Sequence, residues 1–278
     1  MSSSSSPPVN ATDMLLSLPP EILDKILARL PFKEVGWTCC LSHAWERRWE
    51  SVPGLAICFR RNYNATDISH VLTRCAAHVE GFDVFVCRLF RRRALCWLRV
   101  LADKRVRSLN LNFESTPDDV HRGVGLMFPT IASAIYDCGD LCDLRLSYCQ
   151  LPPPALSFAG LVLSTVSLPF AGAGAMLERV IAGAPDLDDL VLRKVSTGVA
   201  SSEVEAWAIR APKLRMLTLW MVIDNGGRIA ERLPLLKTAN IVVDCLLGSE
   251  DLLDTLWKVA SVKVLNFVVY KREPCSGQ

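Results

Sequence analysis

Hydrophobic positions near the N-terminus recur with the period of an amphipathic α-helix. Pro20 and Pro31 enclose a short run whose apolar residues fall on one face at a 3.6-residue period: Ile22, Leu23, Ile26, Leu27 and Leu30. Proline is tolerated at a first helical position and stops a helix from inside, so the two prolines mark the ends of this element. A helix this short is not stable alone in water. Its apolar face must therefore pack against another part of the chain or against another protein.

Later in the chain the apolar positions follow a different pattern, L-x-x-L-x-L, with other apolar residues allowed. Eight occurrences begin at Val79, Val106, Leu141, Leu163, Leu187, Leu214, Leu236 and Val262. Successive starts lie 22 to 35 residues apart, and all but one of these spacings fall in or near the range of leucine-rich repeats. Each unit predicts a short strand with alternate residues facing inward, followed by a turn and a return segment. Units of this kind stack into a curved solenoid.

The repeats are irregular. Residues 141–151 match the full repeat signature, with Cys149 at the position where Asn or Cys is usual. Ala171, Val195 and Val222 stand at that position in other units. The connecting segments predict helices, over residues 173–185, 201–212 and 249–260. The first two segments end in proline, which blocks continuation of the helix and favours an extended chain before the next strand.

The composition allows a large buried core and indicates no charged partner. Half of the 278 residues are hydrophobic, 22% are charged and the formal net charge is +2, so neither nucleic acid nor a membrane surface is expected as a partner. The Ser-rich residues 1–12 cannot bury apolar surface and are expected to be disordered. They also lack the basic residues of a signal peptide. The uncharged stretch 147–177 is long enough to span a bilayer, but Pro169, its glycines and its repeat register favour strands and turns.

The cysteines argue against a secreted scaffold and against a metal site. Eleven cysteines, an odd number with uneven spacing, are typical of reduced and mostly buried thiols, so we expect a protein of the cytoplasm or nucleus. Cys40-x-x-His43 and Cys138-x-x-x-Cys142 loosely resemble metal-ligand spacings. The chain has no C-x-x-C pair, which excludes a RING-like zinc site on ligand grounds. The sequence therefore predicts no catalytic residue, no metal and no cofactor.

A basic run between Arg88 and Arg107 has two interpretations. It could form a patch for an acidic ligand or nucleic acid. It could equally be the solvated face of a helix that turns Trp97 and Leu98 inward, and we favour this second interpretation. Trp207 and Trp257 lie in the predicted connecting helices, where tryptophan is more often a core residue than a ligand contact.

The N-terminal stretch resembles an F-box. The resemblance consists of a Leu-Pro entry, an amphipathic first helix, a Leu-Pro exit, a second helix, and Ser-x-x-Trp on a third helix. Here those parts are Leu18-Pro19, residues 22–30, Leu30-Pro31, a segment around 35–41, and Ser42 with Trp45. Residues 68–86 and 95–111 are similar to the start of the leucine-rich region in the large plant group of F-box proteins.

This resemblance implies a function. In that family the F-box docks on a Skp-type adaptor, which links it to a cullin–RING ubiquitin ligase, and the repeat region binds a target protein that the sequence does not identify. The chain would then be a non-catalytic substrate-recognition subunit. The resemblance implies these adaptor-binding residues: Leu18, Pro19, Ile22, Leu23, Pro31, Val35, Leu41 and Trp45. Gly36 and the pair Cys39–Cys40 depart from the usual second helix, so a leucine-rich scaffold without ligase recruitment stays an alternative.

The predicted fold class is mixed α/β. A short all-α F-box over 13–55 precedes an irregular solenoid of short parallel strands and helices over 56–272, with tails at 1–12 and 273–278. Many members of the plant group continue into a further C-terminal domain, and the sequence leaves open whether this chain is a natural short form or a fragment.

Overall fold

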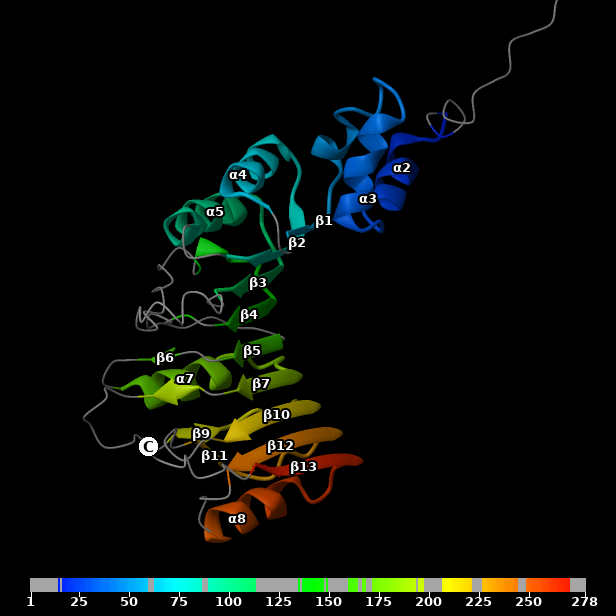
Figure 1. Cartoon of the computed structure of the whole chain (residues 1–278). Coiled ribbons are helices and arrows are strands. Elements are labelled where there is room, and N and C mark those ends of the chain that lie inside the picture. Colours follow the sequence, from blue (N-terminus) through cyan, green and yellow to red (C-terminus); the bar gives the residue numbers. More distant parts are fainter. Residues whose placement is uncertain are drawn as a thin grey trace, which may run out of the picture.

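A sheet of parallel strands, with a small helical part at one end, makes up the computed structural model (Figure 1). It describes residues 15, 17–59, 63–86, 90–113, 135, 137–147, 149, 160–164, 167–168, 172–193, 195–197, 207–221, 227–244 and 249–270. The tails expected at 1–12 and 273–278 lie outside these ranges, so the domain limits there stay predictions.

The N-terminal part begins with two short helices. They are α2 (Pro20–Leu27) and α3 (Phe32–Trp37), and α3 continues into the 3₁₀-helix η1 (Thr38–Cys40). Pro20 occupies the first turn of α2, as the sequence predicts. The second helix begins directly after Pro31, earlier than expected, and it tightens to a 3₁₀ winding before it reaches Leu41.

The third helix of the expected F-box does not form as an α-helix. Residues 43–47 make turns, and η2 (Arg48–Ser51) is a 3₁₀-helix. The amide of Trp45 donates to the carbonyl of Ser42 at 3.0 Å, and the amide of Arg48 donates to that of Trp45 at 3.1 Å. These bonds to the third residue back wind the chain more tightly than an α-helix would. They leave Trp45 in the core, while Arg48 pairs with Asp24 of α2 at 2.5 Å.

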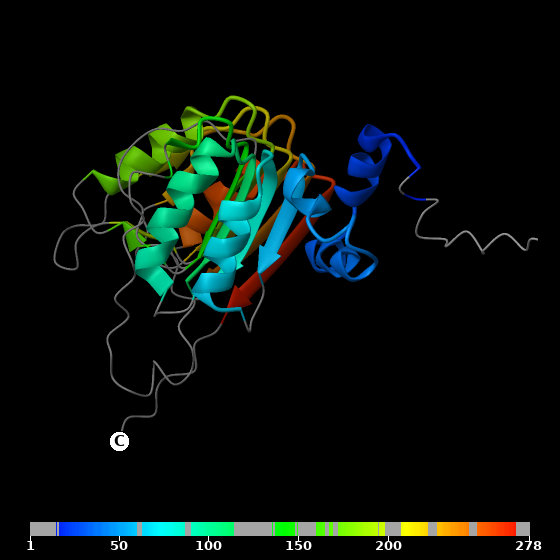
Figure 2. The same ribbon diagram turned by 90° about the horizontal axis from the view of Figure 1, so that it is seen from above.

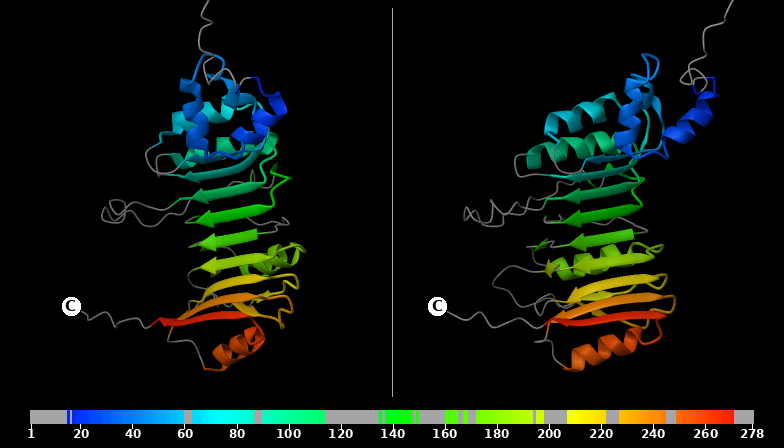
Figure 3. Two further views of the ribbon diagram at one scale, coloured as in Figure 1. Left: turned by 90° about the vertical axis from the view of Figure 1, so that its right-hand side faces the viewer. Right: turned by 45° about the vertical axis from the view of Figure 1, so that its right-hand side comes forward.

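Nine strands form one parallel sheet in which each strand is paired with the one before it in the main ladder. They are β1 (Leu55–Phe59), β2 (Val79–Phe85), β3 (Ser108–Asn112), β4 (Asp143–Ser147), β5 (Gly160–Ser164), β7 (Asp189–Arg193), β10 (Met216–Met221), β12 (Thr238–Asp244) and β13 (Val264–Tyr270). Two further parallel pairs join β6 (Ser167–Leu168) to β8 (Ser196–Thr197) and β9 (Trp207–Ile209) to β11 (Gly227–Ile229). Figure 3 shows the nine strands lying one above another.

The register of the sheet aligns the repeat pattern. One column of paired Cα positions runs through the fourth residue of seven predicted units and through Leu161 of β5: Phe82, Leu109, Leu144, Leu161, Leu190, Leu217, Ala239 and Leu265. Seven predicted units therefore lie on strands at the expected place. The unit predicted to start at Leu163 is wrong in register, because Leu161 and Leu163 of β5 align with the neighbouring strands. Apolar residues alternate along residues 160–168 in two overlapping registers. Pairing of β5 with β4 and β7 selects the register that contains Leu161 and Leu163.

Helices lie along one face of this sheet, as Figure 2 shows for α4 (Ala65–Arg74), α5 (Arg91–Asp103) and α7 (Ala173–Ala182). Asn64 caps α4 by accepting bonds from the amides of Thr66 and Asp67 at 2.8 and 2.9 Å. The helices expected over 173–185 and 249–260 are confirmed as α7 and α8 (Ser249–Val259).

The helix expected over 201–212 is wrong where the structure describes it. Residues 201–206 lie outside the described ranges, and Trp207–Ile209 is strand β9, paired with β11. All three side chains of β9 are buried, which a helix with one solvent face would not allow. Gly227 of β11 leaves room for the ring of Trp207, because an added Cβ there would collide with it.

The two tryptophans expected in the core have different environments. Trp207 is buried, as predicted. Trp257 of α8 is 64% exposed, and Arg232 lies over its ring at 4.6 Å. Within the described ranges no helix is long and apolar enough to cross a membrane. Within the uncharged stretch 147–177, the residues that the structure describes include strand β5 and the beginning of helix α7.

Candidate functional site

The apolar face of α2 divides between the interior and the surface. Leu23 and Leu27 are buried, whereas Ile22 and Ile26 are 44% and 43% exposed. Each pair is separated by four residues and so occupies one strip of the helix surface. Half of the apolar face therefore packs on the chain's own core, and the other half remains available to a second protein.

The eight residues predicted to bind an adaptor fall into three groups. Pro19, Ile22, Pro31 and Leu41 are exposed, Leu18 is half-buried, and Leu23, Val35 and Trp45 are buried. The structure therefore brings only part of the predicted set to the surface.

The three buried residues need a correction. Leu23, Val35 and Trp45 form the core of the N-terminal part, because a domain of this size has few other large apolar side chains to bury. In this conformation they lie beneath the surface and expose almost no side-chain area to a partner. Trp45, expected as an interface anchor, is enclosed, and its indole N–H has no hydrogen-bond acceptor among the described residues.

The predicted set missed one large exposed apolar residue on α2 and one on α3. Ile26 follows Ile22 by one helical turn, so the 3.6-residue period already contained this signal. Trp37 at the end of α3 is 61% exposed, and the ammonium of Lys33 lies 5.0 Å from its ring centroid. We call Ile22, Ile26, Trp37 and Leu41 the outer apolar residues.

Glu50 fastens the N-terminal part to the sheet region. Its carboxylate accepts a bond from Arg47 at 3.1 Å and one from Nε of Arg74, at the end of α4, at 2.8 Å. The bond from Arg47, with that from Arg74, holds the pKa of Glu50 below its ordinary value. The backbone carbonyl of Glu50 also accepts from the amide of Ala76 at 2.7 Å. The outer apolar residues are thus presented on a base that is attached to the first repeat.

The basic run divides into two separate groups. Arg92, Arg93 and Arg99 are exposed on α5, while Trp97 and Leu98 of the same helix are buried. The interpretation as a solvated helix face is therefore confirmed for the described part of this helix. Arg105 and Arg107 lie beyond its C-terminal end, roughly 18 Å from its first residues by helix rise.

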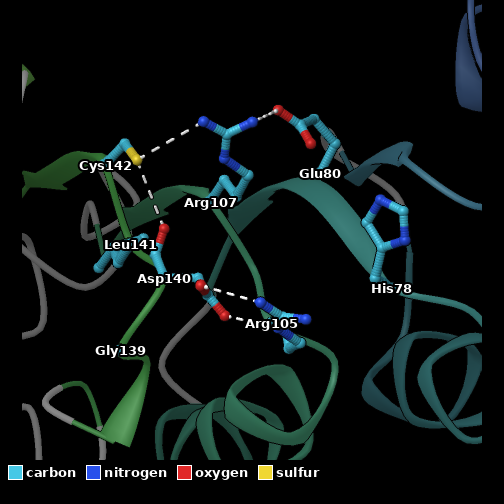
Figure 4. Close-up of a pocket in the computed structure, with 8 residues that line it drawn as sticks. All are labelled: His78, Glu80, Arg105, Arg107, Gly139, Asp140, Leu141 and Cys142. Carbon is cyan, nitrogen blue, oxygen red and sulfur yellow. Dashed lines mark hydrogen bonds and ion pairs between the residues drawn. The ribbon is translucent and has the colours of Figure 1, made fainter.

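A cavity of about 690 Å³ lies where Arg105 and Arg107 approach the ends of three strands (Figure 4). It is lined by His78, Glu80, Arg105, Arg107, Gly139, Asp140, Leu141 and Cys142. Each arginine already has a carboxylate partner. Arg105 bonds Asp140 at 2.8 Å and lowers the pKa of that carboxyl, and Arg107 lies 3.4 Å from Glu80. These ion pairs neutralise the cavity, so its geometry gives little support to an acidic ligand at this place.

The described part of the chain contains no arrangement of side chains suited to metal binding or to thiol chemistry. No group of three His, Cys, Asp or Glu side chains could hold a metal ion there. Burial raises the pKa of Cys138 to about 11, and burial also raises that of Cys149. Both thiols are therefore protonated at neutral pH and poorly nucleophilic.

Comparisons with known proteins agree with the N-terminal geometry. The F-box domain family matches residues 15–55. Over 230 residues the chain is 28% identical to the F-box/LRR-repeat protein At3g26922 of Arabidopsis thaliana, which covers 77% of this chain and 69% of that relative. It is 29% identical over 225 residues to the putative FBD-associated F-box protein At1g55030 of the same plant, covering 78% of this chain.

A third relative, the Arabidopsis F-box/FBD/LRR-repeat protein At5g56420, is 25% identical over 223 residues and 76% of this chain. The chain spans 49% and 50% of the length of the second and third relatives, so about half of each has no counterpart in the aligned region. Residues 15–55 are an F-box domain, and the chain is a homologue of plant F-box/LRR-repeat and FBD-associated F-box proteins.

Proposed function

We propose that this chain is a non-catalytic substrate-recognition subunit of a Skp–cullin–F-box ubiquitin ligase. Its F-box binds a Skp-type adaptor, and its repeat region binds a protein target. The observation that carries the proposal is the exposure of Ile22 and Ile26 on an F-box helix whose other apolar residues are buried. Burying what remains exposed of each side chain would contribute about 1 kcal/mol before the costs of association.

The repeat region has the features expected of a leucine-rich-repeat solenoid. Consecutive parallel strands in register, a shared column of leucines and return segments on one face all support that architecture. We propose that the opposite face of the sheet meets the target. Its polar side chains include Asn110 on β3 and Asn240 on β12, where alternate strand residues point away from the core.

The role is positional. An adaptor-bound F-box joined to a target-bound solenoid keeps two proteins close together and raises their effective concentration without any bond chemistry in this chain. Of the cysteines that the structure describes, only Cys75, Cys138 and Cys149 are buried, so the expectation of mostly buried thiols is wrong for this part of the chain. All the described cysteines are free thiols, which supports a location in the cytoplasm or nucleus. No metal, cofactor, nucleic acid or membrane takes part in this proposal.

A binding experiment with a purified Skp-type adaptor tests the proposal. The double variant Ile22→Asp/Ile26→Asp places two carboxylates on the outer apolar residues, and we expect adaptor affinity to fall by about 100-fold or more, because each loses apolar burial and adds a desolvation cost. Leu253→Asp, at another exposed leucine on α8, is the matched control and should bind as the wild type does. Circular dichroism verifies that all variants are folded.

The scaffold alternative rests on the departures in the F-box. Gly36 lies within the short helix α3, and the third segment winds as turns and 3₁₀-helix. If the folded wild type binds no Skp-type adaptor, recruitment fails and the scaffold function replaces it.

A further inference from the structure

A second cavity, of about 550 Å³, lies at the junction between the F-box and the sheet. The turn from α2 to α3 supplies Ala28 through Lys33, β1 supplies Ala56 and Cys58, and Tyr63 stands before α4. Its volume falls within the range of small-molecule sites, and such sites are favoured between two structural units. Only Pro31 is shared with the predicted adaptor-binding residues.

Aromatic contacts build one wall of this cavity. The rings of Tyr63 and Phe59 meet edge to face with centroids 4.9 Å apart, and Phe59 meets Phe32 in the same way at 5.7 Å. Phe59 is buried in the sheet region and Phe32 belongs to the F-box helix α3. Such edge-to-face pairs fix ring orientation, so the wall is preformed and spans the junction.

The charges in the cavity lining have one sign. Arg29 and Lys33 are the charged residues that line it, both are exposed, and Lys33 also lies against Trp37. On the neighbouring strand β2, the carboxylate of Asp83 accepts a bond from the thiol of Cys58 at 3.6 Å. An apolar, aromatic wall below two cationic groups is complementary to a molecule with a hydrophobic body and one anionic group.

We propose that this junction cavity binds a small amphipathic anion, with its ring or short alkyl body against Phe32, Ala56 and Tyr63 and its carboxylate or sulfonate at Arg29 and Lys33. This activity is additional to adaptor and target binding. Because the lining comes from both the F-box and β1, the bound molecule holds the two parts in a fixed relative position.

Alkylation of Cys58 provides a local measurement. The full chain is titrated with 8-anilinonaphthalene-1-sulfonate, an aromatic sulfonate, and the rate of alkylation by iodoacetamide is followed at each cysteine by mass spectrometry. We expect the probe to slow alkylation of Cys58 at least about fivefold on saturation. Cys96, exposed on α5, is the internal reference and should react at an unchanged rate.

Three variants separate this site from other apolar surface that the probe could contact. Ala56→Leu fills the cavity from an exposed strand position, and we expect the concentration of probe that protects Cys58 to rise about tenfold. Ala175→Leu, at an exposed position on α7, is the matched control and should leave protection unchanged. Arg29→Gln removes one cation and should weaken protection by the sulfonate about threefold to tenfold.

Equal protection in Ala56→Leu and wild type, or equal slowing of Cys58 and Cys96, overturns the proposal. These outcomes are independent of the adaptor experiment, because Ile22→Asp/Ile26→Asp leaves the cavity lining intact and should keep full protection of Cys58.

Discussion

The two ends of the nine-stranded sheet differ in how they are covered. Ile57 on β1 and Leu265 on β13 occupy the same column of paired positions at opposite ends. Ile57 is 1% exposed, and α3 of the F-box packs against the same strand. Leu265 is 42% exposed, and Val268 and Val269 of the same strand are also exposed. Figures 1 and 3 show the F-box at one end and β13 at the other.

This difference shows that the repeat pattern determines which way a side chain points from its strand but does not determine whether that side chain is buried. An apolar residue at the inward position is buried only where other elements cover its strand, as they do at β1. A strand at the edge of a sheet also presents unpaired backbone groups, which other proteins cover or protect with charge. Because α3 packs against β1, the F-box also covers part of the first strand.

The largest expected effect comes from truncating the two equivalent residues. Ile57→Ala should lower the free energy of unfolding by about 3 kcal/mol, because it removes buried methyl groups and leaves a cavity. Leu265→Ala should cost less than about 1 kcal/mol, because solvent already reaches the side chain. Urea denaturation followed by circular dichroism measures both. Equal losses would mean that β13 is as well covered as β1.

The sequence predicted the repeated part of the fold better than its ends. Seven of the eight apolar motifs lie on strands in one register, because the motif directly encodes alternate inward positions. Strand β1 was missed, although Leu55, Ile57 and Phe59 alternate with the period of a strand. The register at 160–168 depended on neighbouring strands, which no local pattern contains.

The candidate site was only partly predictable. The helical period of the apolar residues identified the apolar face of α2. It could not show that Leu23 and Leu27 would be buried while Ile22 and Ile26 would be exposed. That division depends on how the rest of the F-box packs on α2, including a segment around Trp45 whose 3₁₀ winding the sequence did not indicate. The junction cavity combines residues from the F-box, β1 and the segment before α4, so it required the tertiary fold.

A smaller effect concerns pH at the capped end. The pKa of Glu50 is lowered by Arg47 and Arg74, so its stabilising contribution is complete above the ordinary carboxyl pKa of about 4.3 and is lost as pH falls through the lower folded value. Glu50→Gln should therefore be less stable than wild type at pH 7, and the difference should shrink at pH 3. Thermal unfolding of both proteins at the two pH values measures this. A difference that is unchanged at pH 3 would contradict the ionised pair.

At the uncovered end we expect an effect on solubility and little effect on stability. Val268→Lys adds a charge to the exposed edge strand β13, and edge charges oppose strand-to-strand association. The variant should stay monomeric at higher concentration than wild type in sedimentation velocity experiments, with an unfolding midpoint close to that of wild type. Lys263→Gln, a charge removal next to the same strand, is the opposite change and should promote association.

The smallest expected effect concerns Trp257, the tryptophan expected inside and found outside. Arg232 lies 4.6 Å over its ring, and an exposed cation–π contact contributes about 0.5–1 kcal/mol. Arg232→Gln should lower the free energy of unfolding by no more than this, and Trp257→Leu should lower it by a similar amount. The double variant should lose about as much as either single variant, because both remove the same contact. Fully additive losses in this double-mutant cycle would show that the two residues stabilise the uncovered end independently. The contact with Arg232 would then not explain why the ring of Trp257 lies at the surface.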